Sequence, residues 1–456
     1  MTALALLALS ECPSCRNGPL TEAGGELRCD ACAVRYPSLG PVPWLFRDPA
    51  TVLGEWRNRL TMYLEELVQE ERRARADLAD PTLLDASRSR LQRLADAYGG
   101  QRERVAALLA PLALGATPAA LATQRAFATR VPQHQDLHSY YTNLHRDWVW
   151  GAEENARSAE LAGRALAAQP GQRLLVLGAG AGRLAYDLHQ SAPWELTVAL
   201  DINPLLLLSA ERVLSGGSLE LYEFPIAPRT GADHALLRTL QAPAPARAGL
   251  ELVFGDALDA PFAAQSFDAV LTPWLIDILD EDFLELALRV NRLLHPGGRW
   301  VNFGSLAFPG RGPRARYAPD EIEKLLTDAG FRVGERQDAE LPYMRSPASR
   351  HARVETVYLF CAEKHARAPR AARAPAAVSW LENGALPVPP LPELEVTALA
   401  SRLQAFILAL IDGKRSVDDI ARYVTEQKLL APDAARAAVR GLLARLIEEG
   451  ARAGRQ

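Results

Sequence analysis

The chain has 456 residues, which is too long for one ordinary hydrophobic core, so we expect two or three domains. Hydrophobic residues make up 48% of it and charged residues 23%, as in a soluble globular protein, and no apolar run approaches the roughly 20 residues of a membrane helix. The formal net charge of -4 argues mildly against a surface devoted to phosphate backbones, although a local basic patch is compatible with it.

Four of the five cysteines form the pairs Cys12-Pro-Ser-Cys15 and Cys29-Asp-Ala-Cys32. Two such pairs on a short segment can place four thiolates tetrahedrally around one Zn²⁺. Two disulfides or a redox pair are alternatives that a reducing compartment disfavours. Four cysteines leave no open coordination position, so we expect a structural metal that substitutes for a core. Residues 1–10 are apolar without a basic flank, which predicts a cytoplasmic protein without a cleaved signal.

The segment after the second cysteine pair contains Arg35-Tyr36-Pro37 and then Gly40-Pro41-Val42-Pro43-Trp44-Leu45. Together with the cysteines, it resembles the Trm112-like zinc-ribbon family. The resemblance covers about the first 47 residues and implies that 1–50 form a small module that partners or prefixes methyltransferases. Residues 51–136 carry apolar residues at helical spacing and are predicted to form a helical lead or cap over the next domain.

Between residues 173 and 364, short apolar runs alternate with helical patterns, which predicts an α/β fold with a Rossmann-like parallel sheet. The lone Cys361 falls in the last run and is interpreted as a small core residue. The predicted strands are Leu174–Leu177, Leu196–Leu200, Leu250–Phe254, Ala269–Thr272, Arg299–Phe303 and Val354–Cys361.

The first of these strands runs into Gly178-Ala179-Gly180-Ala181-Gly182 and then a helix. Glycines there let the backbone approach a ligand and leave amide N–H groups free at a helix N-terminus. The next strand ends at Asp201, whose carboxylate can accept both hydroxyls of an adenosine ribose. These two features alone fit a dinucleotide as well as S-adenosylmethionine.

Three later marks separate these cofactors. The third strand leads to Gly255-Asp256-Ala257, where a carboxylate can accept from the adenine amino group, Phe267-Asp268 begins the fourth strand, and His295-Pro296-Gly297-Gly298 precedes the fifth. In this order and spacing they resemble class I S-adenosylmethionine-dependent methyltransferases. Singly, each has a structural reading, because Pro-Gly-Gly is first a turn and Asp268 can simply orient a loop.

A narrower resemblance spans residues 137–364. Arg146-Asp147-Trp148, Leu275-Ile276-Asp277 and the run from Gly297 to Gly304 are similar to motifs of the carnosine N-methyltransferase family. The resemblance implies that Arg146 holds the methionine carboxylate, which suits the guanidinium fork, while pairing with Asp147 is the structural alternative. The predicted cofactor contacts are Arg146, Gly178, Ala179, Gly180, Gly182, Asp201, Ile202, Asp256, Ala257, Thr272 and Pro273.

The acceptor side departs from that family. A family motif Gly-Pro-Leu-Leu-Tyr-His, whose His helps bind an imidazole, reads here Gly304-Ser305-Leu306-Ala307-Phe308-Pro309. Carnosine is therefore disfavoured as acceptor, whereas a related imidazole or amine stays open. Asp277 is the first candidate to orient the acceptor or take its proton, with helix capping as the alternative. Tyr343 and His351 are further candidates for acceptor contact.

Residues 365–380 are basic and rich in Ala and Pro, as in a linker. Beyond them, 381–456 are predicted to form a small helical domain with a helix over Val396–Leu410, a helix capped by Ser416 and a helix that starts at Pro432. This order is winged-helix-like, and it resembles the PqqD-like domains, which bind peptides. No basic recognition helix stands out.

The sequence thus predicts a methyltransferase that uses S-adenosylmethionine and a structural Zn²⁺, and methylates nitrogen in a small imidazole- or amine-containing molecule or peptide. One alternative is a nucleic-acid methyltransferase, disfavoured because Thr272-Pro273-Trp274-Leu275 replaces the Asn-Pro-Pro-Tyr of many such enzymes. The other is a biosynthetic enzyme whose tail delivers a peptide or carrier-bound substrate. No membrane partner is expected.

Overall fold

The computed structural model describes residues 4–115, 137–167, 172–279, 281–309, 311–369 and 385–453. The chain divides into two compact units, Met1–Ala372 and Arg373–Gln456. Among the described residues, no helix combines the length and hydropathy of a membrane span.

The N-terminal segment forms a small ribbon built on the predicted cysteine pairs. Its elements are α1 (Leu4–Leu9), β1 (Leu20–Ala23), β2 (Glu26–Cys29), β3 (Arg35–Tyr36), β4 (Ser38–Leu39) and β5 (Val42–Pro43). Strands β1, β2 and β3 make one antiparallel sheet, and β4 pairs with β5. Apolar residues of the ribbon, including Leu6, Leu20 and Leu45, join a core with residues of the large sheet, so the ribbon packs on the next layer rather than standing alone.

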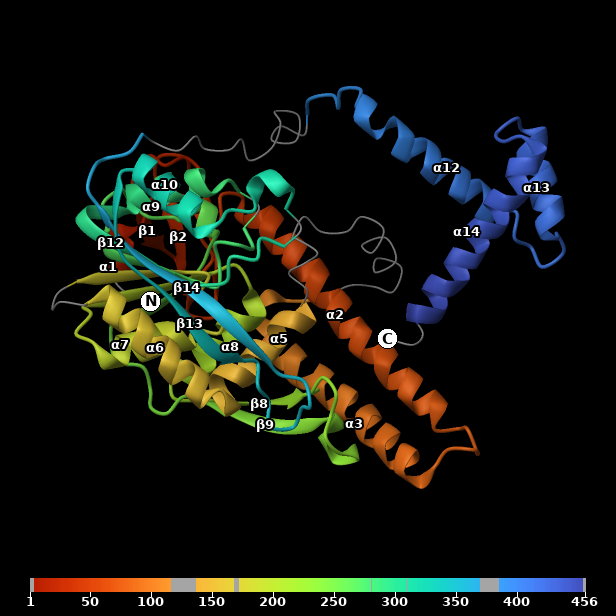
Figure 1. Ribbon diagram of the computed structural model, residues 1–456, viewed down its shortest axis with the longest axis horizontal. Helices are drawn as coiled ribbons and strands as arrows, with labels where there is room; N and C mark the ends of the chain where they lie inside the picture. The colour runs from red at the N-terminus through yellow and green to blue at the C-terminus, as the bar shows by residue number, and fades with distance from the viewer. Residues whose placement is uncertain are drawn as a thin grey trace. The chain divides into compact units, whose positions relative to one another are not determined.

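Two long helices follow and pack as a hairpin (Figure 1). They are α2 (Pro49–Asp77) and α3 (Asp85–Leu108), and the short 3₁₀ turn η1 (Ala110–Leu112) ends this part. Asp48 caps α2, because its side chain accepts from Thr51 N at 3.1 Å. The buried stripe of α2 includes Trp56 and Leu60, in the helical spacing that the sequence predicts. The predicted lead also includes 116–136, which lie outside the described residues.

A seven-stranded sheet forms the centre of the first unit, in the order β10-β7-β6-β11-β12-β14-β13. The five neighbouring strands β10, β7, β6, β11 and β12 run parallel, whereas β14 pairs antiparallel with both β12 and β13. The strands are β6 (Arg173–Leu177), β7 (Leu196–Asp201), β10 (Leu250–Phe254), β11 (Phe267–Pro273), β12 (Leu294–Gly304), β13 (Phe331–Tyr343) and β14 (Arg353–Lys364). The expected α/β fold is confirmed, and each expected strand lies within an observed strand.

Helices cover both faces of this sheet (Figure 1). Leu175 and Leu177 of β6 face the layer of α9, α10 and the ribbon, while Leu174 and Val176 face α6 and α7. This alternation is what strands buried on both faces require. The helices are α5 (Leu137–His145), α6 (Ala152–Leu166), α7 (Arg183–Ser191), α8 (Pro204–Leu214), α9 (Phe283–Leu293) and α10 (Pro319–Asp328), with a π-helical turn η2 (Arg146–Trp150) and 3₁₀ turns η3 (Gly231–His234), η4 (Ala257–Asp259) and η5 (Pro313–Ala315).

One insertion was not expected from the sequence. Strands β8 (Ser218–Glu223) and β9 (Leu236–Gln241) form an antiparallel hairpin between α8 and β10. The hairpin braces the loop after β13, because the buried Glu223 contacts the Ser346 hydroxyl and pairs with Arg238 at 2.8 Å.

The second unit contains the 3₁₀ turn η6 (Pro392–Leu394) and the helices α12 (Glu395–Ala409), α13 (Val417–Glu426) and α14 (Pro432–Ala453). The predicted cap is confirmed, since Ser416 Oγ accepts from Asp419 N at 3.1 Å. Ile407, Ile420 and Val439 share a small core. Residues 385–453 contain no strand in the structure, so the predicted winged-helix likeness stays a prediction.

Candidate active site

A cavity of about 680 Å³ opens where the parallel strands of the sheet end. It has two sides, which we name by their residues. The glycine-loop side comprises Gly178, Ala179, Gly180, Asp201, Ile202, Asn203, Asp256, Ala257 and Leu258; the Asp277 side comprises Pro273, Trp274, Asp277, Ser305, Ala307, Pro309, Tyr343, Arg353 and Glu355. Both sides belong to one continuous space, so two ligands can meet in it.

The glycine loop has the backbone that its sequence requires. Gly178, Gly180 and Gly182 have φ angles of +71°, +58° and +80°, a region that side chains rarely enter. A Cβ on Gly178 would approach Leu275 Cδ1 to 2.7 Å, whereas one on Gly180 would meet no atom within 4 Å. The loop therefore turns its open backbone towards the cavity at Gly180.

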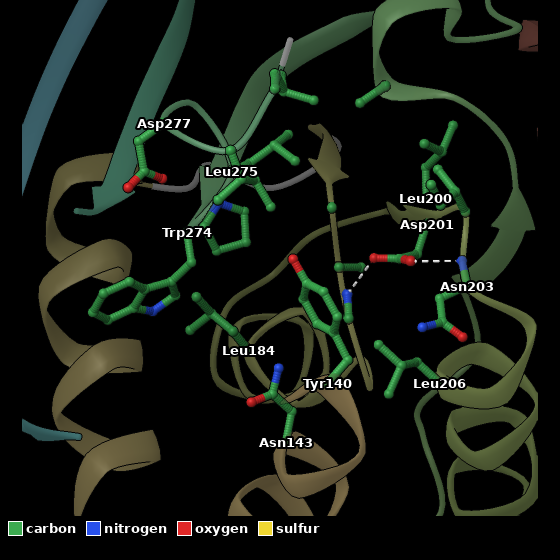
Figure 2. A pocket seen from close by; sticks show the side chains of 18 of the residues that line it. Tyr140, Asn143, Leu184, Leu200, Asp201, Asn203, Leu206, Trp274, Leu275 and Asp277 are labelled. Atoms are coloured by element: carbon green, nitrogen blue, oxygen red, sulfur yellow. Dashed lines mark hydrogen bonds between the residues drawn. The ribbon is translucent and has the colours of Figure 1, made fainter. Parts of the chain in front are cut away.

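Asp201 closes the glycine-loop side and is held by two backbone amides. Its Oδ2 accepts from Gly180 N at 2.7 Å and its Oδ1 from Asn203 N at 2.8 Å (Figure 2). Burial raises the pKa of this carboxyl to about 6, although both amide hydrogen bonds oppose the shift. A carboxylate has about four lone-pair positions, so Asp201 keeps capacity to accept from further hydroxyls.

Asp256 occupies the corresponding place after the edge strand β10. Its Oδ1 accepts from Leu258 N at 2.8 Å and thereby caps the turn η4. Asp256, Ala257 and Leu258 all line the cavity, next to Asp201 in the order of the sheet. The second predicted carboxylate thus stands on the same side of the cavity as the first.

The Arg146-Asp147-Trp148 motif begins the π-helical turn η2 and contacts the glycine loop. Trp148 Nε1 donates to Ala181 O at 3.0 Å, and Arg183 lies over the Trp148 ring at 5.4 Å. Arg183 Nη1 also donates to Asp147 O at 2.8 Å. The motif therefore supports the glycine loop, and its Arg146 and Asp147 line the cavity.

Arg146 lines the cavity between its two sides and is surrounded by acids. Its Nε donates to Asp147 at 2.7 Å and lies 3.5 Å from a Glu154 carboxylate oxygen. Burial disfavours the charge, but Asp147, Tyr343 and Glu154 raise the pKa of the guanidinium above its usual value. The structural alternative from the sequence, pairing with Asp147, is thus realised, and the charged Arg146 side chain still belongs to the lining of the cavity.

Two of the predicted cofactor residues do not line the cavity. Thr272 is fully buried in β11, where its hydroxyl accepts from Trp300 Nε1 at 3.0 Å and donates to Asn302 Oδ1 at 3.1 Å. Gly182 starts α7, and a Cβ there would lie 3.3 Å from the Ala210 Cβ of α8. Both residues therefore pack within the fold next to the site. Pro273, the neighbour of Thr272, does line the cavity.

The Asp277 side is shaped by close packing of loops. Trp274 has φ +51°, and a Cβ on Gly304 would lie 2.8 Å from the Trp274 backbone, so glycine is needed there. The rings of Trp274 and Tyr343 lie 4.6 Å apart, and Arg353 covers Tyr343 at 4.5 Å. Tyr343 is thus part of the cavity wall, and its predicted contact with an acceptor stays a prediction.

Asp277 is a buried carboxyl on this wall. Its Oδ2 accepts from Ala307 N at 3.2 Å, and burial raises its pKa above the ordinary value. Asp282, not Asp277, caps α9, because the Asp282 side chain accepts from Leu284 N at 2.9 Å. The predicted alternative, a helix cap, therefore falls to Asp282, and Asp277 remains available to a ligand. His351, by contrast, is exposed and lies outside the cavity.

Tyr140 and Asn143 line the cavity and were missed by the sequence analysis. Figure 2 shows Tyr140 between Trp274 and Asp201, where the two sides of the cavity meet. Burial and the neighbouring charge of Asp201 raise its pKa to about 12, so its hydroxyl keeps its proton. The usable signal was spacing, since Tyr140, Asn143 and Arg146 follow one another at three-residue steps on one helical face.

A family comparison agrees with this geometry. The model of the carnosine N-methyltransferase family matches residues 125–365, just over half of the chain. The chain belongs to the carnosine N-methyltransferase family. It is therefore an S-adenosylmethionine-dependent methyltransferase, and the resemblance found over residues 137–364 is confirmed. No curated protein matches the chain.

Three of the solved structures similar to this member of the carnosine N-methyltransferase family come from a Bacillus, a Haemonchus and a Haloferax species. The YcgJ protein of Bacillus subtilis is 13% identical, with a TM-score of 0.33 over 46% of this chain and 99% of its own. Phosphoethanolamine N-methyltransferase 2 of Haemonchus contortus, in complex with S-adenosyl-L-methionine, is 20% identical, with a TM-score of 0.30 over 44% and 42%. A complex of the Haloferax volcanii Trm112 methyltransferase activator and a methyltransferase is 17% identical, with a TM-score of 0.34 over 50% and 98%.

The family's acceptor histidine is replaced at a position that the structure places on the cavity wall. Pro309 stands there and lines the Asp277 side. The preceding Phe308 is buried with φ +43° and so fixes the turn of this loop. In this member of the carnosine N-methyltransferase family, the wall has no titratable group at that point. The Asp277 carboxylate contacts the same loop, since it accepts from Ala307 N at 3.2 Å.

The four cysteines of the ribbon have the geometry of a metal centre. Their sulfur atoms lie within 4.8 Å of one another, and the Sγ atoms of Cys12 and Cys32, like those of Cys15 and Cys29, are 3.6 Å apart. Tetrahedral Zn–S bonds of about 2.3 Å would place sulfurs about 3.8 Å apart. The spacing is far beyond a disulfide bond, and all four thiols are free. The donor set therefore fits Zn²⁺.

Proposed function

We propose that this enzyme transfers a methyl group from S-adenosylmethionine to a nitrogen of a small imidazole- or amine-containing molecule or peptide. The observation that carries the proposal is the continuous cavity, which joins the backbone-held Asp201 to the buried Asp277 through Tyr140. Methyl transfer is an in-line displacement, so the main task of the protein is to hold two reactants in contact and exclude water.

On the glycine-loop side, each residue has a distinct binding task. Asp201 would accept from the ribose hydroxyls, since its two backbone hydrogen bonds fix the carboxylate. Asp256 would accept from the adenine amino group. Arg146, whose Nε is engaged by Asp147, would offer its terminal nitrogens to the methionine carboxylate. When bound, the cofactor supplies the electrophilic methyl group.

On the other side, Asp277 would bind the acceptor nitrogen and take its proton. A nitrogen nucleophile needs a free lone pair, and a carboxyl with raised pKa is a better proton acceptor than an ordinary one. Tyr343 would pack against the acceptor and limit its size. Because Pro309 replaces the family's histidine, the acceptor would be oriented by the Asp277 carboxylate and not by a histidine side chain.

The charge of the cavity supports a nitrogen acceptor. Its acidic lining residues outnumber its basic ones, and both basic residues pair with acids. The acidic lining residues are Glu55, Asp147, Glu154, Asp201, Asp256, Asp277 and Glu355; the basic ones are Arg146 and Arg353. Such a wall attracts a protonated amine or imidazole and repels a phosphate backbone. This disfavours the nucleic-acid alternative.

We also propose that Cys12, Cys15, Cys29 and Cys32 hold one structural Zn²⁺. The sulfur spacing supports this, and the apolar residues around the cysteines join the core of the large sheet, so they form no separate core within the ribbon. Metal analysis of the purified protein should find about one zinc per chain. A protein that folds fully without zinc would contradict the assignment.

The test of the methyl-transfer proposal uses the full-length chain and methyl-labelled S-adenosylmethionine. A panel of imidazole dipeptides, histidine, histamine, short diamines and basic peptides is compared with bulk RNA. We expect labelled N-methyl product, identified by mass spectrometry, with one or more imidazole or amine compounds. Turnover with RNA alone, or labelling on oxygen or carbon, would overturn the proposal. Turnover only with peptides would favour substrate delivery by the second unit.

A further inference from the structure

The segment between β10 and β11 is where the ribbon and the cavity meet. It supplies Asp256, Ala257 and Leu258 to the glycine-loop side of the cavity. The residues that follow, Asp259 to Ala263, contact the ribbon, which therefore holds the same short segment that the cavity uses.

The ribbon grips both ends of this segment through backbone hydrogen bonds. At the start, Leu45 N donates to Phe254 O at 2.8 Å. At the end, Glu11 N donates to Pro261 O at 2.9 Å, and Ala263 N donates to Leu9 O at 2.9 Å. The segment 254–263 is therefore tied to the ribbon at two places that are independent of its side chains.

Arg16 grips the middle of the segment. Its guanidinium donates to Ala260 O at 2.9 Å and to Asp259 O at 2.8 Å, and it pairs with the Asp259 carboxylate at 2.5 Å. The Arg16 side chain is only 10% exposed, which makes these bonds stronger than a solvent-exposed ion pair. Asp259 ends the turn η4, which Asp256 caps, so Arg16 fixes the turn that positions the Asp256 carboxylate.

The first cysteine pair fixes the backbone of Arg16. Arg16 directly follows Cys15 and has φ +59°, and Ala33 directly follows Cys32 with φ +60°. Each N–H donates at 2.9 Å to the carbonyl of the first cysteine of its pair, Cys12 or Cys29. This left-handed backbone is unfavourable for a residue with a side chain, so a metal that holds both cysteines of a pair would maintain it.

We propose that the four-cysteine ribbon is a working part of the cofactor site, and that Arg16 is the positioning residue through which metal binding raises cofactor affinity. The inference rests on the proposed cofactor site and the proposed Zn²⁺. Because coupling between two binding sites is reciprocal, bound cofactor must tighten the hold on the metal by the same factor.

The test measures S-adenosylhomocysteine binding by calorimetry on the full-length protein, with zinc content determined for each sample. Zinc-loaded Arg16→Ala and chelator-stripped wild type should each bind at least tenfold more weakly than zinc-loaded wild type. Arg35→Ala is the matched control, since Arg35 is another ribbon arginine but has a 72% exposed side chain and only a 4.0 Å pairing with Glu26. It should bind as wild type does.

The reciprocal measurement follows zinc transfer to a chromogenic chelator. S-adenosylhomocysteine should slow the transfer at least severalfold in wild type and much less in Arg16→Ala. If Arg16→Ala does not fold, Arg16→Lys replaces it, because lysine keeps the charge but cannot reach both carbonyls and the carboxylate with one planar fork.

Equal affinity of stripped and loaded wild type, or of zinc-loaded Arg16→Ala and wild type, would overturn the inference. Failure of zinc-loaded wild type to bind S-adenosylhomocysteine at all would instead overturn the proposed cofactor site. Hydrogen exchange gives an independent readout, since amides of 255–263 should exchange faster in Arg16→Ala while those of β6 do not change.

Discussion

The two sides of the cavity are built in different ways. On the glycine-loop side, the decisive groups are backbone amides and one carboxylate that they hold, with Gly180 N and Asn203 N both on Asp201. On the Asp277 side, the wall consists of side chains from the loops after β11 and β12 and from the strands β13 and β14. Asp277 there accepts from the backbone amide of Ala307 and is also hydrogen-bonded by the Ser305 side chain. A ligand common to many enzymes can be bound by backbone geometry, whereas a particular acceptor needs particular side chains.

Backbone strain follows the same division. The left-handed residues of the glycine-loop side are glycines, which adopt that conformation without penalty. On the Asp277 side, Trp274 has a φ angle of +51°. Phe308 and Met344, which adjoin Pro309 and Tyr343 of that side, have φ angles of +43° and +55°. Non-glycine residues in this region cost on the order of 1 kcal/mol or more each and persist where the surroundings impose them. Of the two sides of the cavity, the one proposed to bind the acceptor thus carries the backbone strain.

The largest expected effect tests the Asp277 side alone. Asp277→Asn keeps the shape of the wall but removes the proton acceptor, so we expect kcat to fall about 100-fold or more. The Kd for S-adenosylhomocysteine should stay within about twofold, because Asp277 lies away from Asp201. Single-turnover kinetics and calorimetry measure the two quantities. A variant with normal kcat would remove Asp277 from the chemistry.

The matching change on the glycine-loop side is Asp201→Asn. Both carboxylate oxygens accept from backbone N–H groups, so an amide nitrogen must oppose one of these donors. Loss of charge-assisted hydrogen bonds of about 1.5–3 kcal/mol should weaken S-adenosylhomocysteine binding about 10- to 100-fold. Asp328→Asn, the same substitution at an exposed aspartate of α10 that does not line the cavity, is the control. An unchanged Kd in Asp201→Asn would contradict the assignment.

A pH series separates the sides more finely. The pKa of Asp201 is raised to about 6 in the free protein, and ribose binding favours its ionised form. Binding of S-adenosylhomocysteine should therefore weaken as pH falls below about 6, by about tenfold at pH 5. The sign for folding is opposite: a raised carboxyl pKa stabilises the free protein below about pH 4, and this contribution is lost as pH rises to about 6. Calorimetry across this window should show a shallower slope in Asp201→Asn.

The smallest effect is expected where the sides meet. Tyr140→Phe removes one hydroxyl between Asp201 and Trp274 while the ring stays in place. The loss of about 1 kcal/mol should change both the Kd for S-adenosylhomocysteine and kcat by about fivefold. An effect on only one quantity, seen in the same binding and turnover assays, would assign the hydroxyl to one side.

Sequence reasoning was most successful where function depends on local backbone. Gly180, Asp201 and Asp256 each follow a recognisable strand, so their place at the edge of the sheet was predictable. Thr272 shows the limit of that logic. Residues alternate faces along a strand, and β11 continues to Pro273, so Thr272 points into the core while its neighbour reaches the cavity.

The Asp277 side was less predictable because its parts come together only through tertiary packing. Tyr343 and His351 are eight residues apart, yet the end of β13 keeps Tyr343 on the wall while the following loop carries His351 outwards. That loop is held by the β8–β9 insertion, in which no element was predicted. The contact between Arg16 and Asp259 joins residues 243 positions apart, and no local sequence pattern predicts it.

The parallel pairing of Trp44 with Phe254 has a consequence for handling the protein. β10 is the outermost strand of the large sheet at that end, and its unpaired backbone would be a template for association with other chains. The ribbon covers it, with the Trp44 and Phe254 rings 5.2 Å apart. A truncated form that begins after the ribbon would expose this apolar edge and aggregate, so the enzyme must be expressed and engineered with its first 45 residues in place.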